Sequence, residues 1–319
     1  MENIHKRKLN TKAMQTILAF SSLILLIIIF SVASPNFLTG NNVVTILLMT
    51  AVNGILAVGI TFVIVTGGID LSLGTVMTFC SVIAGVCITY LNLPIPVGIL
   101  GAMAAGAFLG FINGINITKL GLPPFIATLG MMNIAKGFNL IISGTKPIYF
   151  IDKPLFGTIA TRPIAGIPLG VIIFFTCALI ASFILSKTII GRYTFAIGSN
   201  EEAARLSGIN TGAWKLAIYS LSGAFIGVAG VVMASRLNSA QPALGPGYEM
   251  DAIAAAVIGG ASLSGGEGSI LGTVIGAFII TVLTNGLRIL SVPQEWQMVA
   301  TGLIVIGAVY LDIVRRRAK

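Results

Sequence analysis

A short charged stretch, residues 200–208, lies in a break between two long apolar runs. Its middle consists of good helix formers: Glu201, Glu202, Ala203, Ala204, Arg205 and Leu206. Asn200 can cap the start of this helix, and Gly208 can end it. A helix of about two turns is too short to be stable alone, so packing must hold it in place. Its exposed side is then available to another protein. The stretch therefore predicts a binding surface for a partner protein.

Asp70 follows two glycines and separates two apolar runs, with no basic residue nearby. An ionised aspartate at the centre of a bilayer would cost about 2.5–3.5 kcal/mol. Two interpretations are open. In the first, Asp70 caps the next helix by accepting hydrogen bonds from the amides of Ser72 and Leu73. In the second, the glycine-rich turn dips into a helix bundle, and Asp70 shapes or gates a transport pathway.

Five other polar residues lie within or beside apolar runs. Lys136 either extends its amine to the membrane interface or belongs to a pathway. Asn53 and Asn113 can bond neighbouring helices or contact passing hydroxyl groups. Glu249 and Asp251 start a late apolar run. They form either a solvated helix start or a docking surface for an external protein.

Signatures of enzyme chemistry are missing from the sequence. It has no Gly-x-x-x-x-Gly-Lys-Ser/Thr phosphate loop, so this chain does not hydrolyse ATP by that route. The single histidine, His5, lies in the polar N-terminal stretch, and Cys80, Cys87 and Cys177 lie inside apolar runs. These positions give no metal-ligand spacing. We therefore expect no metal site, no cofactor held by this chain and no enzymatic activity.

The composition identifies the solvent of this protein. Of its 319 residues, 56% are hydrophobic and only 9% are charged, whereas a soluble domain carries roughly 25% charged residues. This small number of charged residues cannot cover a water-soluble surface. The bilayer must therefore surround most of the chain. The net charge of +9 therefore concerns membrane orientation, and we expect no nucleic-acid partner.

Apolar runs long enough to cross a bilayer predict an all-α, polytopic membrane protein with about ten transmembrane helices. The predicted spans are 14–33, 42–66, 72–90, 96–118, 124–142, 168–186, 214–234, 248–264, 269–288 and 297–313. The eighth is short and rich in small residues, and a re-entrant segment is its alternative. Ser31-Val32-Ala33 loosely resembles a signal-peptidase site, but we expect the first span to be retained.

Charge distribution predicts the orientation of these spans. Of the 19 Lys and Arg residues, thirteen fall on the side of the N-terminus, five on the other side and one, Lys136, within a span. Because cytoplasmic loops are enriched in basic residues, both termini are expected in the cytoplasm. A re-entrant eighth segment would place Arg315, Arg316 and Arg317 outside, so ten crossings are preferred.

The connections between the spans suggest a single transmembrane permease domain, residues 1–319. Its main cytoplasmic loop is 187–213, which contains the charged stretch. Two longer external segments, 143–168 and 235–251, are rich in proline, which ends helices. We expect them to be ordered caps that are non-helical or contain short helices.

Small residues predict where the helices approach one another closely. Ala102, Gly106, Gly110 and Gly114 recur every four residues, as do Gly223 with Gly227 and Gly272 with Gly276. Such faces let backbones pack closely in lipid. A weak internal repeat aligns residues 67–74 with 259–266. Both copies would end spans of the same direction, as a parallel repeat requires.

Several motifs together resemble the permease subunits of ribose-type ABC importers for simple sugars. They run in matching order from residue 34 to residue 266: Ser34-Pro35-Asn36-Phe37, Gly67-Gly68-Ile69-Asp70-Leu71-Ser72, Phe125-Ile126-Ala127-Thr128-Leu129, Gly191-Arg192-Tyr193, Ala196-Ile197-Gly198-Ser199-Asn200-Glu201, Ala203-Ala204-Arg205-Leu206-Ser207-Gly208-Ile209, Ser239-Ala240-Gln241-Pro242, Gly247-Tyr248-Glu249-Met250-Asp251-Ala252-Ile253-Ala254 and Gly259-Gly260-Ala261-Ser262-Leu263-Ser264-Gly265-Gly266.

This resemblance implies a homodimer of permeases in the bacterial cytoplasmic (inner) membrane that encloses one sugar pathway. It also implies a cytoplasmic ATP-binding subunit, which binds ATP and Mg, and an external sugar-binding protein that delivers a monosaccharide such as ribose. The charged stretch matches the family's coupling helix. Glu201, Glu202, Ala203, Ala204, Arg205 and Gly208 would then contact the ATPase, and segments 143–168 and 235–251 would receive the binding protein.

Two other classes of protein compete with this interpretation. An ion-coupled secondary transporter would use Asp70 and Lys136 as its coupling residues. A scaffold membrane protein would transport nothing. The transported sugar is not evident from the sequence, because close relatives carry different pentoses and hexoses.

Overall fold

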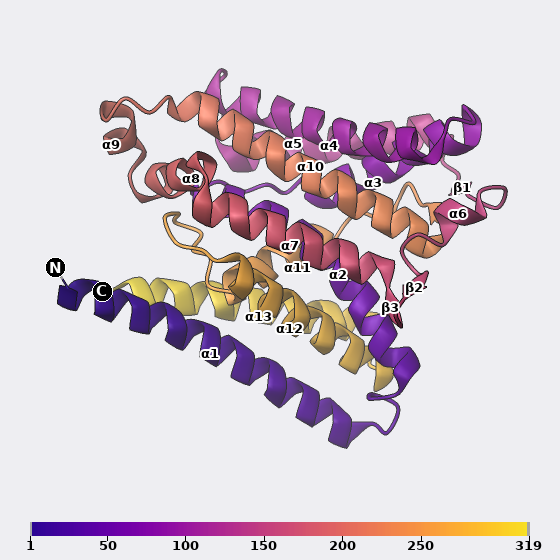
Figure 1. The fold of residues 1–319 in the computed structure, drawn as a ribbon, viewed down its shortest axis with the longest axis horizontal. Helices are drawn as coiled ribbons and strands as arrows, with labels where there is room; N and C mark the ends of the chain where they lie inside the picture. The colour runs from indigo at the N-terminus through magenta and orange to yellow at the C-terminus, as the bar shows by residue number, and fades with distance from the viewer. Residues whose placement is uncertain (1, 318–319) are drawn as a thin grey trace.

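The computed structural model of the protein describes residues 2–317. Its long helices are α1 (Glu2–Ala33), α2 (Gly40–Val65), α3 (Leu73–Gly85) with its π-helical continuation η1 (Val86–Tyr90), α4 (Ile95–Thr118), α5 (Pro124–Ser143), α7 (Leu169–Lys187), α10 (Thr211–Leu237), α12 (Ile270–Ile289) and α13 (Gln294–Arg317) (Figure 1). Its shorter helices are α6 (Pro154–Gly157), α8 (Ile189–Ser199), α9 (Glu201–Leu206) and α11 (Tyr248–Ile258). Two antiparallel pairs join two-residue strands: β1 (Ile148–Tyr149) with β4 (Ser239–Ala240), and β2 (Pro163–Ile164) with β3 (Ile167–Pro168).

Eight helices within the described part of the chain are long and apolar enough to cross a membrane. They coincide with the first seven predicted spans and with the ninth, to within a few residues at each boundary. The tenth prediction, 297–313, falls inside α13. The predicted class, a mostly helical polytopic membrane protein, is confirmed.

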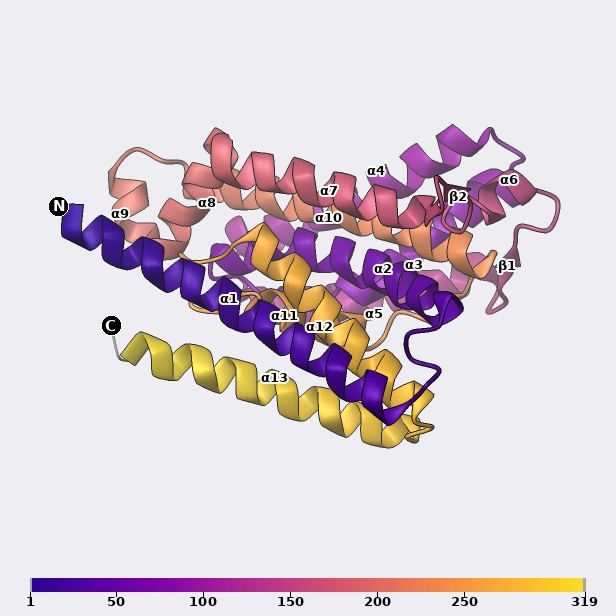
Figure 2. The ribbon, with the colours of Figure 1, turned by 60° about the horizontal axis from the view of Figure 1, so that its bottom comes forward.

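The helices lie side by side and give the molecule two distinct ends (Figures 1 and 2). One end carries α9 together with the start of α1 and the end of α13; we call it the α9 end. The opposite end carries α6 and the four strands; we call it the strand end. The proline-rich segment 143–168 is thus an ordered cap of short elements, as predicted.

The eighth predicted span, 248–264, differs from the structure in its helical length. α11 has 11 residues, or about 16 Å at 1.5 Å per residue, which is too short to cross a hydrocarbon core of about 30 Å. It ends where Gly259 and Gly260 begin a loop, and Gly260 has φ +94°. The chain still passes from β4 at the strand end to α12, which starts near α8. A connection with two turns, residues 241–247, and a half-length helix make this passage together.

Two helices begin at the same place inside the bundle. The connection after α2 leads into α3, and the connection after α10 leads into α11. The first turn of α3 meets the second connection at Gly74 and Gly245, where a Cβ added at either glycine would overlap the other's backbone carbonyl. Backbones can approach this closely only where neither residue has a side chain. The sequence did not indicate this contact.

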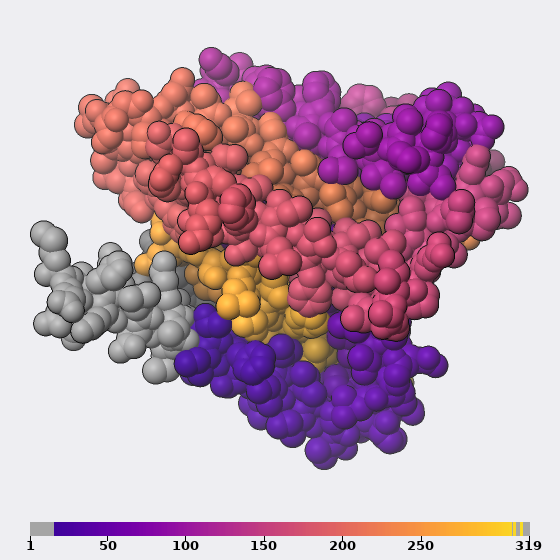
Figure 3. Space-filling view, in the orientation of Figure 1, coloured from indigo at the N-terminus to yellow at the C-terminus, as the bar shows by residue number. Residues whose placement is uncertain are grey.

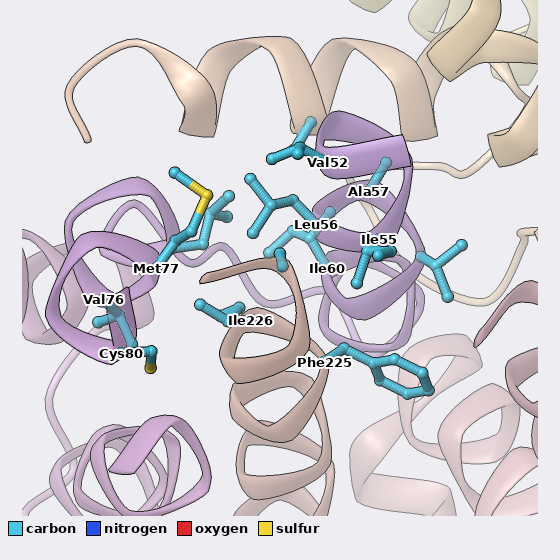
Figure 4. Packing of buried hydrophobic residues seen from close by; sticks show 14 of the residues in the cluster. Val52, Ile55, Leu56, Ala57, Ile60, Val76, Met77, Cys80, Phe225 and Ile226 are labelled. Atoms are coloured by element: carbon cyan, nitrogen blue, oxygen red, sulfur yellow. The ribbon is translucent and has the colours of Figure 1, made fainter. Parts of the chain in front are cut away.

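The core forms around α2. In the most hydrophobic part of this helix, 72% of the residues are buried. Apolar side chains of α2, α3 and α10 pack together there: Val52, Ile55, Leu56, Ala57, Ile60, Val76, Met77, Cys80, Phe225 and Ile226 (Figure 4). α4 packs closely along α10, since a Cβ at Gly106 would overlap the carbonyl oxygen of Gly223. The predicted small-residue faces therefore form real helix contacts.

The two copies of the predicted repeat, 67–74 and 259–266, lie beside each other. A Cβ at Gly67 would be 3.7 Å from the carbonyl oxygen of Ser264. Each copy follows a helix that runs towards the α9 end and precedes one that runs away from it, in agreement with a parallel repeat. On the face shown in Figure 3, α7 crosses the middle of the molecule, and α12 lies between it and α1.

Candidate coupling and transport sites

α9 forms a short helix with the predicted boundaries. Asn200 lies before its first turn, and the Asn200 Oδ1 atom accepts a hydrogen bond of 2.9 Å from the amide of Ala203. Gly208 has φ +86°, and its amide donates to the carbonyl oxygen of Arg205. The left-handed backbone at Gly208 ends the helix at low steric cost because glycine has no Cβ. The capping residues named from the sequence therefore perform those functions.

The side chains of α9 divide into a packed side and an exposed side. Ala204 is buried and holds the helix against the protein. Glu201 pairs with Lys215 of α10 at 2.6 Å, and Glu202 pairs with Arg205 at 2.7 Å. Exposed ion pairs contribute little to stability, so Glu202 and Arg205 can exchange this pair for contacts with a partner protein.

Leu206 is the residue of this site that sequence analysis did not select. Its side chain is 77% exposed at the last turn of α9. Single exposed apolar residues are common on protein surfaces, so Leu206 alone does not mark a contact surface. It adds an apolar side chain to the exposed charged pair of α9. The signal in the sequence was a leucine within an otherwise small and charged helix.

Asp70 lies inside the helix bundle, with only 2% of its surface exposed. Its Oδ1 atom accepts hydrogen bonds from the amide of Ser72 at 2.8 Å and from the Ser72 hydroxyl at 2.6 Å. Asn113 of α4 donates from Nδ2 to the same hydroxyl, at 3.1 Å. Of the two amides predicted to donate to Asp70, only that of Ser72 does so. Asp70 therefore orders Ser72, the residue before the first turn of α3, and Ser72 links that start to α4.

The four residues considered for a pathway are not gathered at one place. Asp70 and Asn113 are connected through Ser72, and both are buried. Lys136 is exposed on α5, so its amine does not neutralise the enclosed Asp70 carboxylate. Asn53 is buried on α2, and its Oδ1 atom has no hydrogen-bond partner among the described residues.

Glu249 and Asp251 lie in the first turn of α11, as predicted for a helix start, but Glu249 is not solvated. Glu249 is 8% exposed, and its Oε1 atom accepts a hydrogen bond from the amide of Gly247 at 3.0 Å. A Cβ at Gly74 would be 2.6 Å from Glu249 Oε2, so this carboxylate packs against the first turn of α3. Asp251 is half-buried. In this conformation an external protein could not reach Glu249.

The surface of the strand end is built from both predicted external segments. The two segments, 143–168 and 235–251, are joined where β1 pairs with β4. Ile148 lies opposite Ala240, and Tyr149 lies opposite Ser239. An open pocket beside this pairing is lined by Thr145, Pro147, Gln241, Pro242, Ala243 and Leu244. Tyr149, Ile151 and Leu155 are exposed near it. This joined surface, rather than the Glu249 carboxylate, is accessible to another protein.

Comparison with known proteins supports the transport assignment. A family model described as a branched-chain amino acid transport system permease component matches residues 42–309. The chain is 41% identical to the ribose import permease protein RbsC of Haemophilus influenzae over 297 residues, which cover 92% of each chain. It is 44% identical to RbsC of Bacillus subtilis over 301 residues, 94% of this chain and 93% of the relative.

A permease for another sugar is nearly as similar. The D-allose transport system permease protein AlsC of Escherichia coli is 37% identical over 294 residues, 92% of this chain and 90% of the relative. No solved structure matches the chain. With its apolar helices, the protein is a multi-pass protein of the bacterial inner membrane. The chain belongs to the family of transport-system permease components and, within it, to the ribose-type ABC permeases.

Proposed function

We propose that this chain is the membrane-spanning subunit of an ATP-driven importer and moves a monosaccharide delivered by an external binding protein. The observation that carries the proposal is α9, a capped helix that presents Glu202, Arg205 and Leu206 at one end of a helix bundle. If ATP drives transport, a chain without a phosphate loop needs another subunit to hydrolyse it, and α9 offers that subunit an exposed contact surface.

The substrate class follows from the relatives. Two of them are ribose import permeases, and a third is a D-allose permease. We propose ribose or a similar sugar as the substrate. ATP and Mg would bind to the partner subunit, and this chain would hold neither.

The α9 end is proposed to face the cytoplasm, with ten crossings and both termini on that side. Lys119, Lys187, Arg192 and Lys215 lie in or beside the connections at this end. The basic bias of cytoplasmic loops supports this orientation. The joined surface of 143–168 and 235–251 would then face the external binding protein.

A second copy of the permease is the proposed partner within the membrane. Lys136 is exposed on α5, a helix long and apolar enough to cross the bilayer. A lysine exposed on a membrane helix is costly against lipid, and such residues usually face a bundle interior or a water-filled cavity. We propose that this side of α5 faces a pathway enclosed by two copies, where Lys136 contacts water or passing hydroxyl groups.

Ion-coupled transport is the less favoured function. It would need Asp70 and Lys136 to act together, but Asp70 is enclosed and bonded to Ser72, while Lys136 is exposed on α5. The relatives are named as permease proteins for ribose import and for D-allose transport.

Uptake into proteoliposomes tests the function directly. The permease is reconstituted with its ATPase subunit, with ATP inside and with the binding protein and labelled D-ribose outside. D-Allose serves as a second labelled sugar. Uptake of at least one of the two sugars should require internal ATP and should persist when ionophores collapse the ion gradients. Uptake driven by a gradient without ATP would overturn the proposal, as would failure of the ATPase subunit to copurify in mild detergent.

A further inference from the structure

Three segments that are distant in sequence meet at the end of α8. They are the end of α2 with Gly67, the end of α8 at Gly198, and the loop between α11 and α12 at Gly265 and Gly266. We call this contact the glycine junction. Figures 1 and 2 both show the loop before α12 beside α8.

The glycine junction is packed backbone against backbone. A Cβ at Gly198 would overlap the carbonyl oxygen of Val65 and would lie 2.5 Å from the amide nitrogen of Gly266. A Cβ at Gly265 would lie 2.7 Å from the carbonyl oxygen of Gly198 and 2.9 Å from the amide nitrogen of Gly67. Contacts this short to backbone atoms leave no room for a side chain.

A hydrogen bond joins two of these segments, the end of α2 and the loop before α12, and α8 packs against both. The amide of Gly266 donates to the carbonyl oxygen of Val65 at 2.9 Å. Gly67, Gly265 and Gly266 have φ of +79°, +83° and +76°. Glycine adopts these angles without steric cost. Because no flexible side chain separates these backbones, the three segments of the glycine junction can move together as one body.

α8 connects the glycine junction to α9 through a single residue. The amide of Asn200 donates to the carbonyl oxygen of Ala196 and so closes α8. The side chain of the same residue caps α9 through Ala203. One residue therefore ends one helix and starts the next, so a displacement of α9 acts directly on Gly198 and Ser199.

Beyond the glycine junction, the chain leads to the centre of the bundle in two directions. From Gly67 it continues to Asp70 and Ser72, which fix the start of α3 and bond Asn113 of α4. From Gly265 it leads back to α11 and, through Gly266, forward to α12. A movement at the junction therefore acts on the start of α3 and on the loop that joins α11 to α12.

We propose that the glycine junction is the rigid joint that passes a displacement of α9 to the connections at 66–72 and 259–269. This inference rests on the proposed coupling function of α9. Gly198 is then a positioning residue for transport, and its backbone contact is what transmits the movement. The joint has to stay intact during the transport cycle, because its three segments shift together.

Replacing Gly198 tests whether the joint transmits movement. Gly198→Ala forces α8 away from Val65, so the complex should keep its ATPase subunit and its basal ATP hydrolysis within about twofold. Uptake of whichever sugar, D-ribose or D-allose, the unmodified importer carries should fall at least tenfold, as should the stimulation of hydrolysis by the loaded binding protein. Gly212→Ala at the start of α10 is the control, because a Cβ there has its nearest neighbours at 3.7 Å. Wild-type coupling in Gly198→Ala would overturn the proposal.

A disulfide across the glycine junction tests whether its segments move together. It also tests the proposal if the Gly198→Ala variant fails to insert into the membrane. A Cβ at Gly268 would overlap only the Val65 Cγ2 atom, and its next neighbour, Ala261 Cβ, lies at 3.5 Å. Val65→Cys with Gly268→Cys therefore brings two thiols of the α2 end and the loop before α12 within bonding range, without replacing a glycine of the junction. Cys80, Cys87 and Cys177 are first replaced by alanine. A rigid joint predicts equal uptake by the oxidised and reduced forms of this variant. Loss of uptake on oxidation, with recovery on reduction, would show that the segments slide and would overturn the inference.

Wild-type protein separates this inference from the proposed function. If the unmodified complex shows no ATP-dependent uptake and binds no ATPase subunit, the proposed function fails and the joint fails with it. If the unmodified complex transports and Gly198→Ala does so equally well, the joint alone is wrong and the function of α9 stands.

Discussion

The Asp70 carboxylate orders the start of α3 directly and is linked to α4 through Ser72. It fixes the start of α3 through the Ser72 amide, and Ser72 in turn accepts a hydrogen bond from Asn113 of α4. A buried polar group that loses its partner costs about 1–3 kcal/mol. The bonds of Asp70 to Ser72 explain its burial as part of the turn before α3, and its predicted place in a pathway stays a prediction.

Substitution of Asp70 distinguishes capping from a pathway function. Asp70→Ala should lower the free energy of unfolding by about 1–3 kcal/mol, because the Ser72 amide loses its acceptor. Asp70→Asn keeps an oxygen at that position and should lose less. Thermal unfolding in detergent measures both, and Asp152→Ala at an exposed aspartate is the control. Wild-type stability combined with abolished uptake in Asp70→Ala would instead indicate a pathway residue.

At the scale of elements, α9 is a contact surface that the rest of the protein positions. Asn200 and Gly208 define its ends, and Ala204 with the Glu201–Lys215 pair fixes it against its neighbours. The remaining side chains face solvent and include one exposed leucine. An isolated apolar side chain on a short charged helix suits a partner groove, in which burial of a leucine contributes roughly 1.5–3 kcal/mol.

Leu206→Glu should weaken binding of the ATPase subunit by about 10- to 100-fold, because it replaces that apolar contact with a charge. Copurification at graded salt and detergent measures this loss, and membrane insertion should stay normal. Leu155→Glu, at a leucine of similar exposure on the strand end, should leave ATPase binding unchanged. Equal binding by wild type and Leu206→Glu would remove Leu206 from the contact surface.

On the scale of the whole molecule, the path of the chain between β4 and α12 determines the number of crossings. α11 is too short to span the bilayer alone, yet the segments before and after it lie at opposite ends of the bundle. Ala243 is exposed at the strand end, and Ser264 is exposed in the loop before α12.

Labelling single cysteines checks this path. In a background without native cysteines, Ala243→Cys should react with a membrane-impermeant maleimide in intact cells. Ser264→Cys should react only in inside-out vesicles. Labelling of both from the same side would show that the segment re-enters the membrane without crossing it.

Local patterns predicted the long helices and the cap and end of α9, because apolar runs and capping residues act over a few positions. Three features depend on contacts between distant parts of the chain and escaped prediction. Glu249 is buried because Gly74 and Gly245, far apart in sequence, let two backbones meet. α11 ends early at Gly259 and Gly260 because their loop belongs to the glycine junction. α8 was not predicted as a helix, because its 11 residues are too few to cross a bilayer and include two glycines.

The peripheral position of α1 also affects how the protein is made. Its apolar part, Thr16–Ala33, is only 6% buried, and the helix packs against α12. The ribosome synthesises α12 roughly 240 residues after α1, or roughly 10–50 seconds later at about 5–20 residues per second. For that time the nascent helix has no α12 to pack against. Its mean hydropathy of 2.7 lets it remain in lipid by itself until its partner emerges from the translation machinery.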